Sequence, residues 1–299
     1  MAWIIPLEYS EDRNRMRIIR KYLRDVMNPF DLSENLFCRA YRIPKLLVHQ
    51  LIEEIRPFAQ NIGLVPLHLQ VLSVLNFYAT GGYQMSVGSH AFHNLSQTMM
   101  SRYVSYYSHL ITQHLAPKYI RFPRSVNQMA EIKTHFEAQY HFPGILGVID
   151  GTHIALTALP LEIENAFVNR KGYHSINTQI VCDANMLIIN INARFPGSTH
   201  DSFIFGGSML HTRLEELHQN DPATFNFLLG DSAYSLSPWL MKIFDGNNLS
   251  AEQEHFNHEL CAIRQIVERT IGLLKVRFRC ILGDRKLRYK PTKICLQMP

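Results

Sequence analysis

Hydrophobic residues along this chain recur with two different periods, and the change comes near Pro143. Before it, apolar residues recur every three or four positions, which predicts helices; after it, short apolar runs predict strands. The pattern therefore divides the chain into a helical domain, residues 1–140, and an α/β domain, residues 141–299.

Five helices are expected in the first domain. Their predicted ranges are 10–27, 44–56, 66–80, 96–115 and 128–140. Ser10 and Ser96 stand where an N-cap would accept the free amide hydrogens of a first turn. The pair Gly81–Gly82 closes the third helix, because glycine commonly ends helices.

The third and fourth helices, with the turn between them, form a helix-turn-helix candidate over about residues 66–115. Gln97, Ser101 and Arg102 lie on a polar flank of the second of these helices, from which they could contact DNA. Met100 and Val104 would pack inward. A polar flank is also ordinary on any helical bundle, so both interpretations stay open.

The second domain begins with a strand that contains Asp150. Strands over 176–182 and 186–193 follow, joined by a turn at Asp183–Asn185, then a helix over 201–217, a strand over 225–229 and a late helix over 260–278. This order matches the ribonuclease-H-like fold. The fold class is therefore α/β: a helical N-terminal half, then a mixed sheet with flanking helices.

Composition narrows the class of protein. A hydrophobic share of 46% and a charged share of 18% describe a globular chain, and the net charge of +5 permits nucleic-acid binding without requiring it. No apolar run approaches the roughly 18 residues that span a bilayer, so we expect no membrane partner. The 5 cysteines lack metal-site spacing and favour a reducing compartment.

Three carboxylates occupy the places at which this fold gathers acidic side chains. Asp150 lies on the first strand, Asp231 follows the fourth strand, and Glu268 lies on the late helix. Such a set can hold two divalent ions for phosphodiester chemistry. Each residue also has a plainer interpretation: an Asp-Gly turn at Asp150, a turn residue at Asp231, and a surface ion pair of Glu268 with Arg264 or Arg269.

The second carboxylate of the set could instead be Asp201. Asp231 ends a strand that we expect to lie beside the first, whereas Asp201 stands at the expected N-terminus of a helix, where capping would be a sufficient structural role. We therefore place Asp231 in the primary set and Asp201 as an accessory metal ligand.

A resemblance to a known family extends from about Asn28 to Lys290. It is carried by Asn28–Asp31, Tyr78–Ser86, Leu95–Gln97, Met100–Arg102, Gly147–His153, Arg170–Asn177, Pro196–Ser202, Leu228–Tyr234, Phe256–Asn257, Arg264, Glu268, Lys275 and Arg277–Phe278. In these blocks the chain resembles the transposases of PIF/Harbinger elements and the host nucleases derived from them. Each block alone is weak, but the set is specific.

The resemblance implies a DDE-type nuclease that hydrolyses DNA with Mg²⁺ or Mn²⁺. Asp150, Asp231 and Glu268 would be catalytic, and Arg264 and Lys275 would contact substrate phosphates. A domesticated DNA- or chromatin-binding protein without activity is the alternative. A phosphohydrolase for small substrates is a weaker third hypothesis, because the helical half argues against it.

The resemblance also implies a partner and a compartment. In this family a separate Myb-like protein commonly supplies site recognition and nuclear entry, and the run Arg285–Lys290 is a poor import signal. We therefore expect partner-assisted nuclear localisation, with some of the protein in the cytoplasm, and leave a homo-oligomer open. The chain stops at Pro299, where family members usually continue, which favours a truncated nuclease domain.

Overall fold

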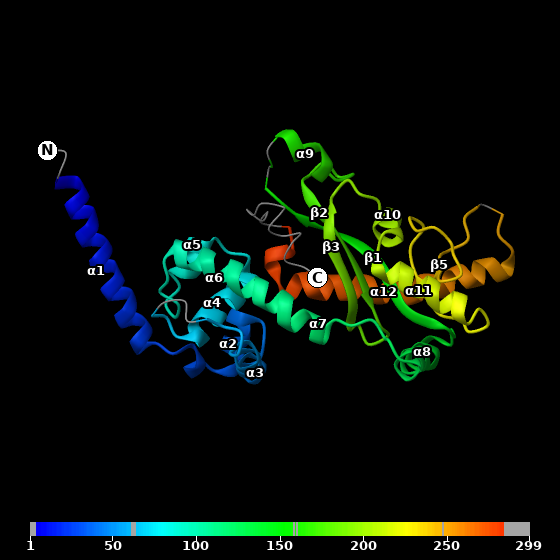
Figure 1. Ribbon diagram of the computed structural model, residues 1–299, viewed down its shortest axis with the longest axis horizontal. Coiled ribbons are helices and arrows are strands. Elements are labelled where there is room, and N and C mark those ends of the chain that lie inside the picture. Colours follow the sequence, from blue (N-terminus) through cyan, green and yellow to red (C-terminus); the bar gives the residue numbers. More distant parts are fainter. Residues whose placement is uncertain (1–3, 61–63, 158, 160, 247, 284–299) are drawn as a thin grey trace. The chain divides into compact units, whose positions relative to one another are not determined.

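The computed structural model describes residues 4–60, 64–157, 159, 161–246 and 248–283. These residues form two compact units (Figure 1). The first contains the chain up to His114 together with Arg277–Ile281, and the second contains Leu115–Val276. The helix before the sheet, Val126–Tyr140, belongs to the second unit and not with the helices up to Leu110.

The first unit is helical, as the hydrophobic pattern predicts. Its elements are α1 (Ile4–Val26), a 3₁₀ turn (Pro29–Asp31), α2 (Glu34–Tyr41), α3 (Lys45–Ile55), α4 (Leu67–Thr80), α5 (Gln84–Gly88), α6 (Gln97–Leu110) and the 3₁₀ turn Arg279–Ile281. Helix α4 is buried on almost every side, which its nearly continuous apolar sequence allows, and it forms the centre of this unit.

Of the two N-caps that the sequence predicts, at Ser10 and Ser96, only the second is present in the structure. Helix α1 begins at Ile4, so the predicted cap at Ser10 is wrong. Ser96 does cap α6, because its side chain accepts a hydrogen bond from the amide of Met99 at 3.3 Å. Helix α6 ends at Leu110 and continues as a π-helical segment, Ile111–Leu115, which the pattern did not indicate.

The second unit is built on a five-stranded mixed sheet. Its strands are β1 (Ile145–Ala155), β2 (Ser175–Cys182), β3 (Ile188–Pro196), β4 (Phe227–Leu229) and β5 (Leu240–Met241), and they lie in the order β3-β2-β1-β4-β5. Strands β1 to β3 are antiparallel neighbours, and β4 and β5 run parallel to β1. This is the ribonuclease-H-like arrangement that the element order predicts.

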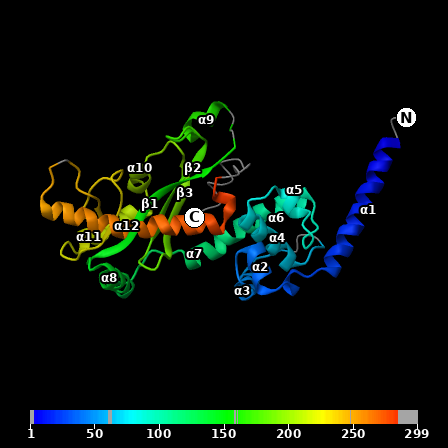
Figure 2. The ribbon, with the colours of Figure 1, turned by 180° about the vertical axis from the view of Figure 1, so that it is seen from behind.

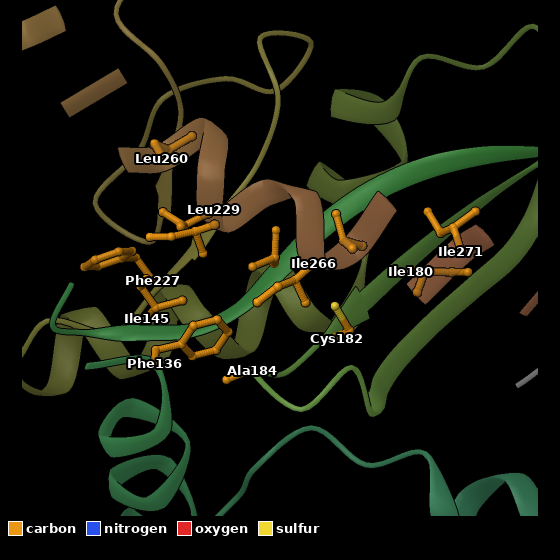
Figure 3. Packing of buried hydrophobic residues seen from close by; sticks show 13 residues of the cluster. Phe136, Ile145, Ile180, Cys182, Ala184, Phe227, Leu229, Leu260, Ile266 and Ile271 are labelled. Carbon is orange, nitrogen blue, oxygen red and sulfur yellow. The ribbon is translucent and has the colours of Figure 1, made fainter. Parts of the chain in front are cut away.

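Helices cover both faces of this sheet. The helices of this unit are α7 (Ala116–Tyr119), α8 (Val126–Tyr140), α9 (Leu161–Phe167), α10 (Asp201–Gly206), α11 (Met209–Asn220) and α12 (Ala251–Arg277). Helix α12 lies across one face (Figure 2), where Ile266 and Ile271 pack against Ile180 and Leu229 (Figure 3). On the other face, Leu210 and Leu214 of α11 pack with residues such as Ile149.

Several boundaries differ from those that the pattern predicts. Strand β1 runs through Asp150 and Gly151, so the Asp-Gly turn interpretation is wrong. The single helix expected over 201–217 is two helices, because Ser208 caps a new one. Helix α9 and strand β5 carried no recognised signal. No helix within the described residues is long and apolar enough to cross a membrane.

Candidate metal-dependent nuclease site

The residues of β1 alternate between two different environments. Val148 packs in the cluster with α12, and its neighbour Ile149 packs in the cluster with α11. Since side chains alternate along a strand, Asp150 and Thr152 belong to the α12 face and Gly151 and His153 to the opposite face. The register agrees, because Ile180, which lies opposite Asp150, also packs against α12.

Asp150 on β1 and Asp231, two residues beyond the end of β4, occupy equivalent positions relative to the pairing of the two strands. Strands β1 and β4 are parallel, and Val148 pairs with Leu229. Each aspartate lies two residues further along its own strand direction. In a parallel pair such positions lie side by side on one face, and Leu229 packs in the α12 cluster. The sheet therefore brings these two carboxylates together toward α12.

Asp150 carries an unusually high pKa. Burial raises the pKa of this carboxyl to about 6, while the amide of Gly151 and the charge of Arg264 act to lower it, and Asp231 and Asp201 add to the rise. Its one hydrogen bond within the described chain is from the Gly151 amide, at 2.9 Å. No cationic side chain in that part of the chain lies within ion-pair distance of it, which is typical of a functional carboxylate.

Asp231 is held in a turn of its own at the end of β4. Its Oδ1 accepts the amide of Ala233 at 3.0 Å, and its carbonyl accepts the amide of Tyr234 at 3.2 Å. The turn interpretation of Asp231 is thus correct, and it does not exclude the metal-site interpretation, because one carboxylate oxygen remains available.

Helix α12 presents Arg264, Glu268 and Lys275 on one flank. These residues are four and seven positions apart, and such spacings return to the same side of a helix. Arg264 acts on the pKa of Asp150. Lys275 Nζ donates to Thr152 Oγ1 at 2.6 Å and to the carbonyl of His153 at 3.2 Å. Glu268 lies between two residues that both reach β1 or its carboxylate.

Glu268 itself does not meet the aspartates. Its side chain is 59% exposed, and Arg264 Nη2 approaches its Oε1 at 4.0 Å, so the surface ion pair that the sequence suggested is present. Among the described residues, no three His, Cys, Asp or Glu side chains are arranged as metal ligands. The donor set nevertheless suits Mg²⁺ or Mn²⁺, which prefer carboxylate oxygens. Asp150 and Asp231 lie near enough for the charge of Asp231 to raise the pKa of Asp150, whereas Glu268 does not join them in this structure.

Asp201 lies on the opposite face of β1. A Cβ atom on Gly151 would clash with the carboxylate of Asp201, so this carboxylate lies directly against the glycine. Asn177 Nδ2 donates to the same Oδ1 at 2.7 Å. Asp201 is the first residue of α10, and His200 occupies the N-cap position, so the predicted capping role is wrong.

Tyr234 and Gln179 complete this opposite face, and the sequence interpretation did not single them out. Gln179 Nε2 donates to the Tyr234 hydroxyl at 3.0 Å and to the carbonyl of Asp201 at 3.3 Å. Burial raises the pKa of Tyr234, and the charges of Asp201 and Asp150 add to that rise. A tyrosine three residues after Asp231 was part of a quoted block, but nothing in its spacing indicated this contact.

The three candidate DNA-contacting residues lie together on α6 in the first unit. Gln97 and Arg102 are exposed, and Ser101 is half-buried. The inward residues Met100 and Val104 are buried, as predicted. Between α4 and α6 the chain forms the short helix α5, and nothing confirms a helix-turn-helix. The DNA-reading role of these residues stays a prediction.

Comparisons with known proteins identify the family of the chain. Residues 149–298 match the family described as DDE superfamily endonuclease. The human protein named "Putative nuclease HARBI1" is 31% identical over 269 residues, which cover 88% of this chain and 74% of that protein. Its Xenopus laevis counterpart is 29% identical over 88% of this chain and 75% of that protein.

A plant relative is more distant. The Arabidopsis thaliana protein named Antagonist of Like Heterochromatin Protein 1 is 26% identical over 77% of this chain and 59% of that protein. No solved structure matches the chain. The matched family, the extent of the similarity and the strand order lead to one conclusion: the chain belongs to the DDE superfamily endonucleases, among the Harbinger transposase-derived nucleases.

Proposed function

We propose that this protein is a divalent-metal-dependent endonuclease that hydrolyses DNA phosphodiester bonds. One observation carries the proposal: Asp150 and Asp231 lie at equivalent positions of β1 and β4, on the sheet face covered by α12. Helix α12 brings Arg264 and Lys275 to this face and carries Glu268 between them. Relatives named as nucleases support the class of reaction.

Asp150, Asp231 and Glu268 would hold Mg²⁺ or Mn²⁺. When bound, the metal would activate the attacking water and stabilise the leaving oxygen of the scissile bond. Asp201, on the other face of β1, would support the site as an accessory through its charge and its contact with Gly151.

Arg264 and Lys275 would bind the phosphates of the substrate. Lys275 is positioned by two oxygen atoms of β1, two and three residues beyond Asp150. Arg264 Nε is buried and lacks a hydrogen-bond partner in the described part of the chain, so the guanidinium retains donor capacity. Positive groups fixed beside a transferring phosphoryl group stabilise its developing charge.

The exposure of Glu268 favours a second function. If the side chain never leaves Arg264, the protein would bind DNA or chromatin without cutting it. A relative whose name refers to a heterochromatin protein is consistent with that role. The two functions differ in whether the protein cuts DNA, a reaction for which the carboxylates would be needed.

A plasmid-nicking experiment separates them. Purified protein is incubated with supercoiled plasmid and Mn²⁺ or Mg²⁺, and the loss of supercoiled DNA is followed over time. The wild type is expected to nick the plasmid, and Glu268→Gln is expected to reduce the rate by about 10³-fold.

Glu254→Gln is the matched control. It makes the same chemical change on the same helix, about 21 Å along its axis from Glu268. Equal activity of wild type, Glu268→Gln and Glu254→Gln would reject the proposed chemistry. Absence of nicking by the wild type, with DNA binding retained, would favour the binding protein.

We also propose that both units contact DNA and that a Myb-like partner brings the protein to the nucleus. The exposed Arg102 on α6 and Lys275 on α12 would each contact a phosphate. Alanine at both positions should reduce the salt dependence of DNA binding by about two units of slope, one per lost contact. An unchanged slope would contradict this part of the proposal.

Localisation has a separate test. The basic run Arg285–Lys290 lies outside the described residues. The chain fused to a fluorescent protein and expressed alone should remain largely in the cytoplasm, and co-expression with a Myb-like partner should move it into the nucleus. Nuclear accumulation without a partner would contradict the proposed dependence.

A further inference from the structure

A basic hairpin lies beside the candidate site and has no role in it so far. We define it as residues 168–174. Val168 and His174 form an antiparallel bridge, and the amide of Asn169 donates to the carbonyl of Tyr173 at 3.0 Å. Gly172 has a φ of +77°, which closes the turn with little strain for glycine. The tip presents Arg170 and Lys171, and both are exposed.

The hairpin is fixed from within by Asn169. This buried side chain accepts the amide of Lys171 at 2.9 Å through Oδ1, and through Nδ2 it donates to Ser175 Oγ at 2.9 Å. Ser175 Oγ in turn lies 3.1 Å from His153 Nδ1. The tip is therefore connected by hydrogen bonds to β1, three residues beyond Asp150.

Arg170 is directed toward Asp201, on the face of β1 opposite to Asp150. Its Nη2 lies 3.0 Å from His200 Nδ1, and this neighbouring ring leads directly into Asp201. Neither Arg170 nor Lys171 forms an ion pair with another described residue. Lys171 adds to the effect of burial in lowering the pKa of Lys275. Arg170, Lys171 and Lys275 all act to lower the pKa of His153.

We propose that Arg170 and Lys171 form a phosphate-binding element that holds the DNA backbone beside the scissile bond. Among the described residues, none of these three cations, Arg170, Lys171 and Lys275, has a carboxylate at ion-pair distance, so they repel one another, and a polyanion relieves that repulsion. Because Asn169 already holds the tip of the hairpin, the backbone that carries the two charges would lose little conformational freedom on binding DNA. The proposal rests on the proposed nuclease function for its substrate, and it assigns a role to residues outside the carboxylate set.

The test is a salt titration of DNA binding. Affinity of the full chain for a duplex oligonucleotide is measured by fluorescence anisotropy in EDTA, at several KCl concentrations. Arg170→Gln/Lys171→Gln should lower the slope of log affinity against log salt concentration by about two units, one per lost phosphate contact. Arg170→Lys/Lys171→Arg keeps both charges and should keep the slope.

Arg124→Gln/Arg213→Gln is the matched control. It removes the same charge, at the start of α8 and on α11, where Arg213 Nη2 donates to the carbonyl of Arg124. The control should keep the wild-type slope. Equal slopes for the hairpin variant and the control would overturn the proposal, and so would a wild type that does not bind DNA.

Nicking assays then distinguish this inference from the proposed function. The hairpin variant should require several-fold more DNA for half-maximal nicking, with the rate at saturating DNA nearly unchanged, because it loses binding and not chemistry. A protein that never nicks but shows the hairpin-dependent slope would refute the nuclease and support the phosphate-binding element. A nicking protein with an unchanged slope would refute only the element.

Discussion

The two faces of β1 around Asp150 carry different chemistry on consecutive residues. On the α12 face, Asp150 is a half-buried carboxylate without a cation at ion-pair distance among the described residues, and Thr152 receives Lys275. On the opposite face, Gly151 has no side chain and leaves room for the carboxylate of Asp201, whose Oδ1 already accepts a hydrogen bond from Asn177. The carboxylate on the α12 face has oxygen atoms available to bind a metal ion. The carboxylate on the opposite face already accepts a hydrogen bond from a neutral side chain.

This difference distinguishes the roles of Asp231 and Asp201, which the sequence alone left partly open. A metal ion gains most where carboxylates are close together and lack other partners. Asp231 lies in register with Asp150 on the α12 face, whereas Asp201 reaches the group from behind the strand. We therefore expect the two to differ sharply in function although both influence the pKa of Asp150.

The largest expected effect is on activity. Asp231→Asn should lower plasmid nicking by about 10³-fold and abolish high-affinity Mn²⁺ binding, because it removes a charged ligand from the site. Asp201→Asn should retain Mn²⁺ binding and much of the activity. Circular dichroism confirms that each variant is folded. The reverse result, with Asp201→Asn inactive and Asp231→Asn active, would require the two assignments to be exchanged.

The next effect is on the stability of the metal-free protein. The pKa of Asp150 is about 6 in the folded state against 3.8 for an ordinary Asp, so its folded form favours the proton. Ionisation therefore costs stability as pH rises from about 4 to 6, and the cost stays constant above that range. Asp150→Asn should stabilise the protein in EDTA by about 2 kcal/mol at pH 7, and by nothing at pH 4.

Urea unfolding at the two pH values measures this stability difference. The control is Asp12→Asn, on the exposed part of α1. Asp221→Asn is less suitable, because Asp221 accepts a hydrogen bond from Thr224. A gain for Asp150→Asn that is equal at both pH values would show that its burial, and not its charge, sets the cost.

A smaller change tests the contact on the opposite face. Gly151→Ala places a methyl group against the Asp201 carboxylate and should destabilise the protein by about 1–3 kcal/mol in urea unfolding, as overpacking does. Asp201→Ala in the same chain should restore much of that loss. Gly206→Ala, where a Cβ would meet nothing within 4 Å, is the control. No rescue would place the strain elsewhere on β1.

The smallest effect concerns the position of Lys275. Thr152→Val removes the hydroxyl oxygen that accepts the Lys275 ammonium, so nicking should fall by about fivefold, the equivalent of one hydrogen bond. Thr134→Val on α8, which loses a hydroxyl bonded to its own helix, should leave activity unchanged. A larger loss for Thr152→Val than for Lys275→Ala would show that Thr152 acts other than through this lysine.

Much of the second unit follows from local sequence signals. Alternating and continuous apolar runs identified β1 to β4, because each strand buries at least one face beneath the helices that cover the sheet. Strand β5 and helix α9 were missed, since two residues and seven residues carry too little periodicity. The N-terminus of α12 was placed nine residues late because its first turns are polar.

The sequence alone determined the kinds of residue available for the site: carboxylates at 150, 231 and 268, and cations at 264 and 275. Their order along the chain also indicated the fold, since strand and helix periods are local properties. Only the tertiary structure decided which of them share a face. Register and pairing between strands far apart in sequence place Asp231 beside Asp150 and put Asp201 behind Gly151. They also connect the hairpin of Arg170 and Lys171 to His153 through Asn169 and Ser175. These are long-range contacts, and a linear pattern of residues does not specify them.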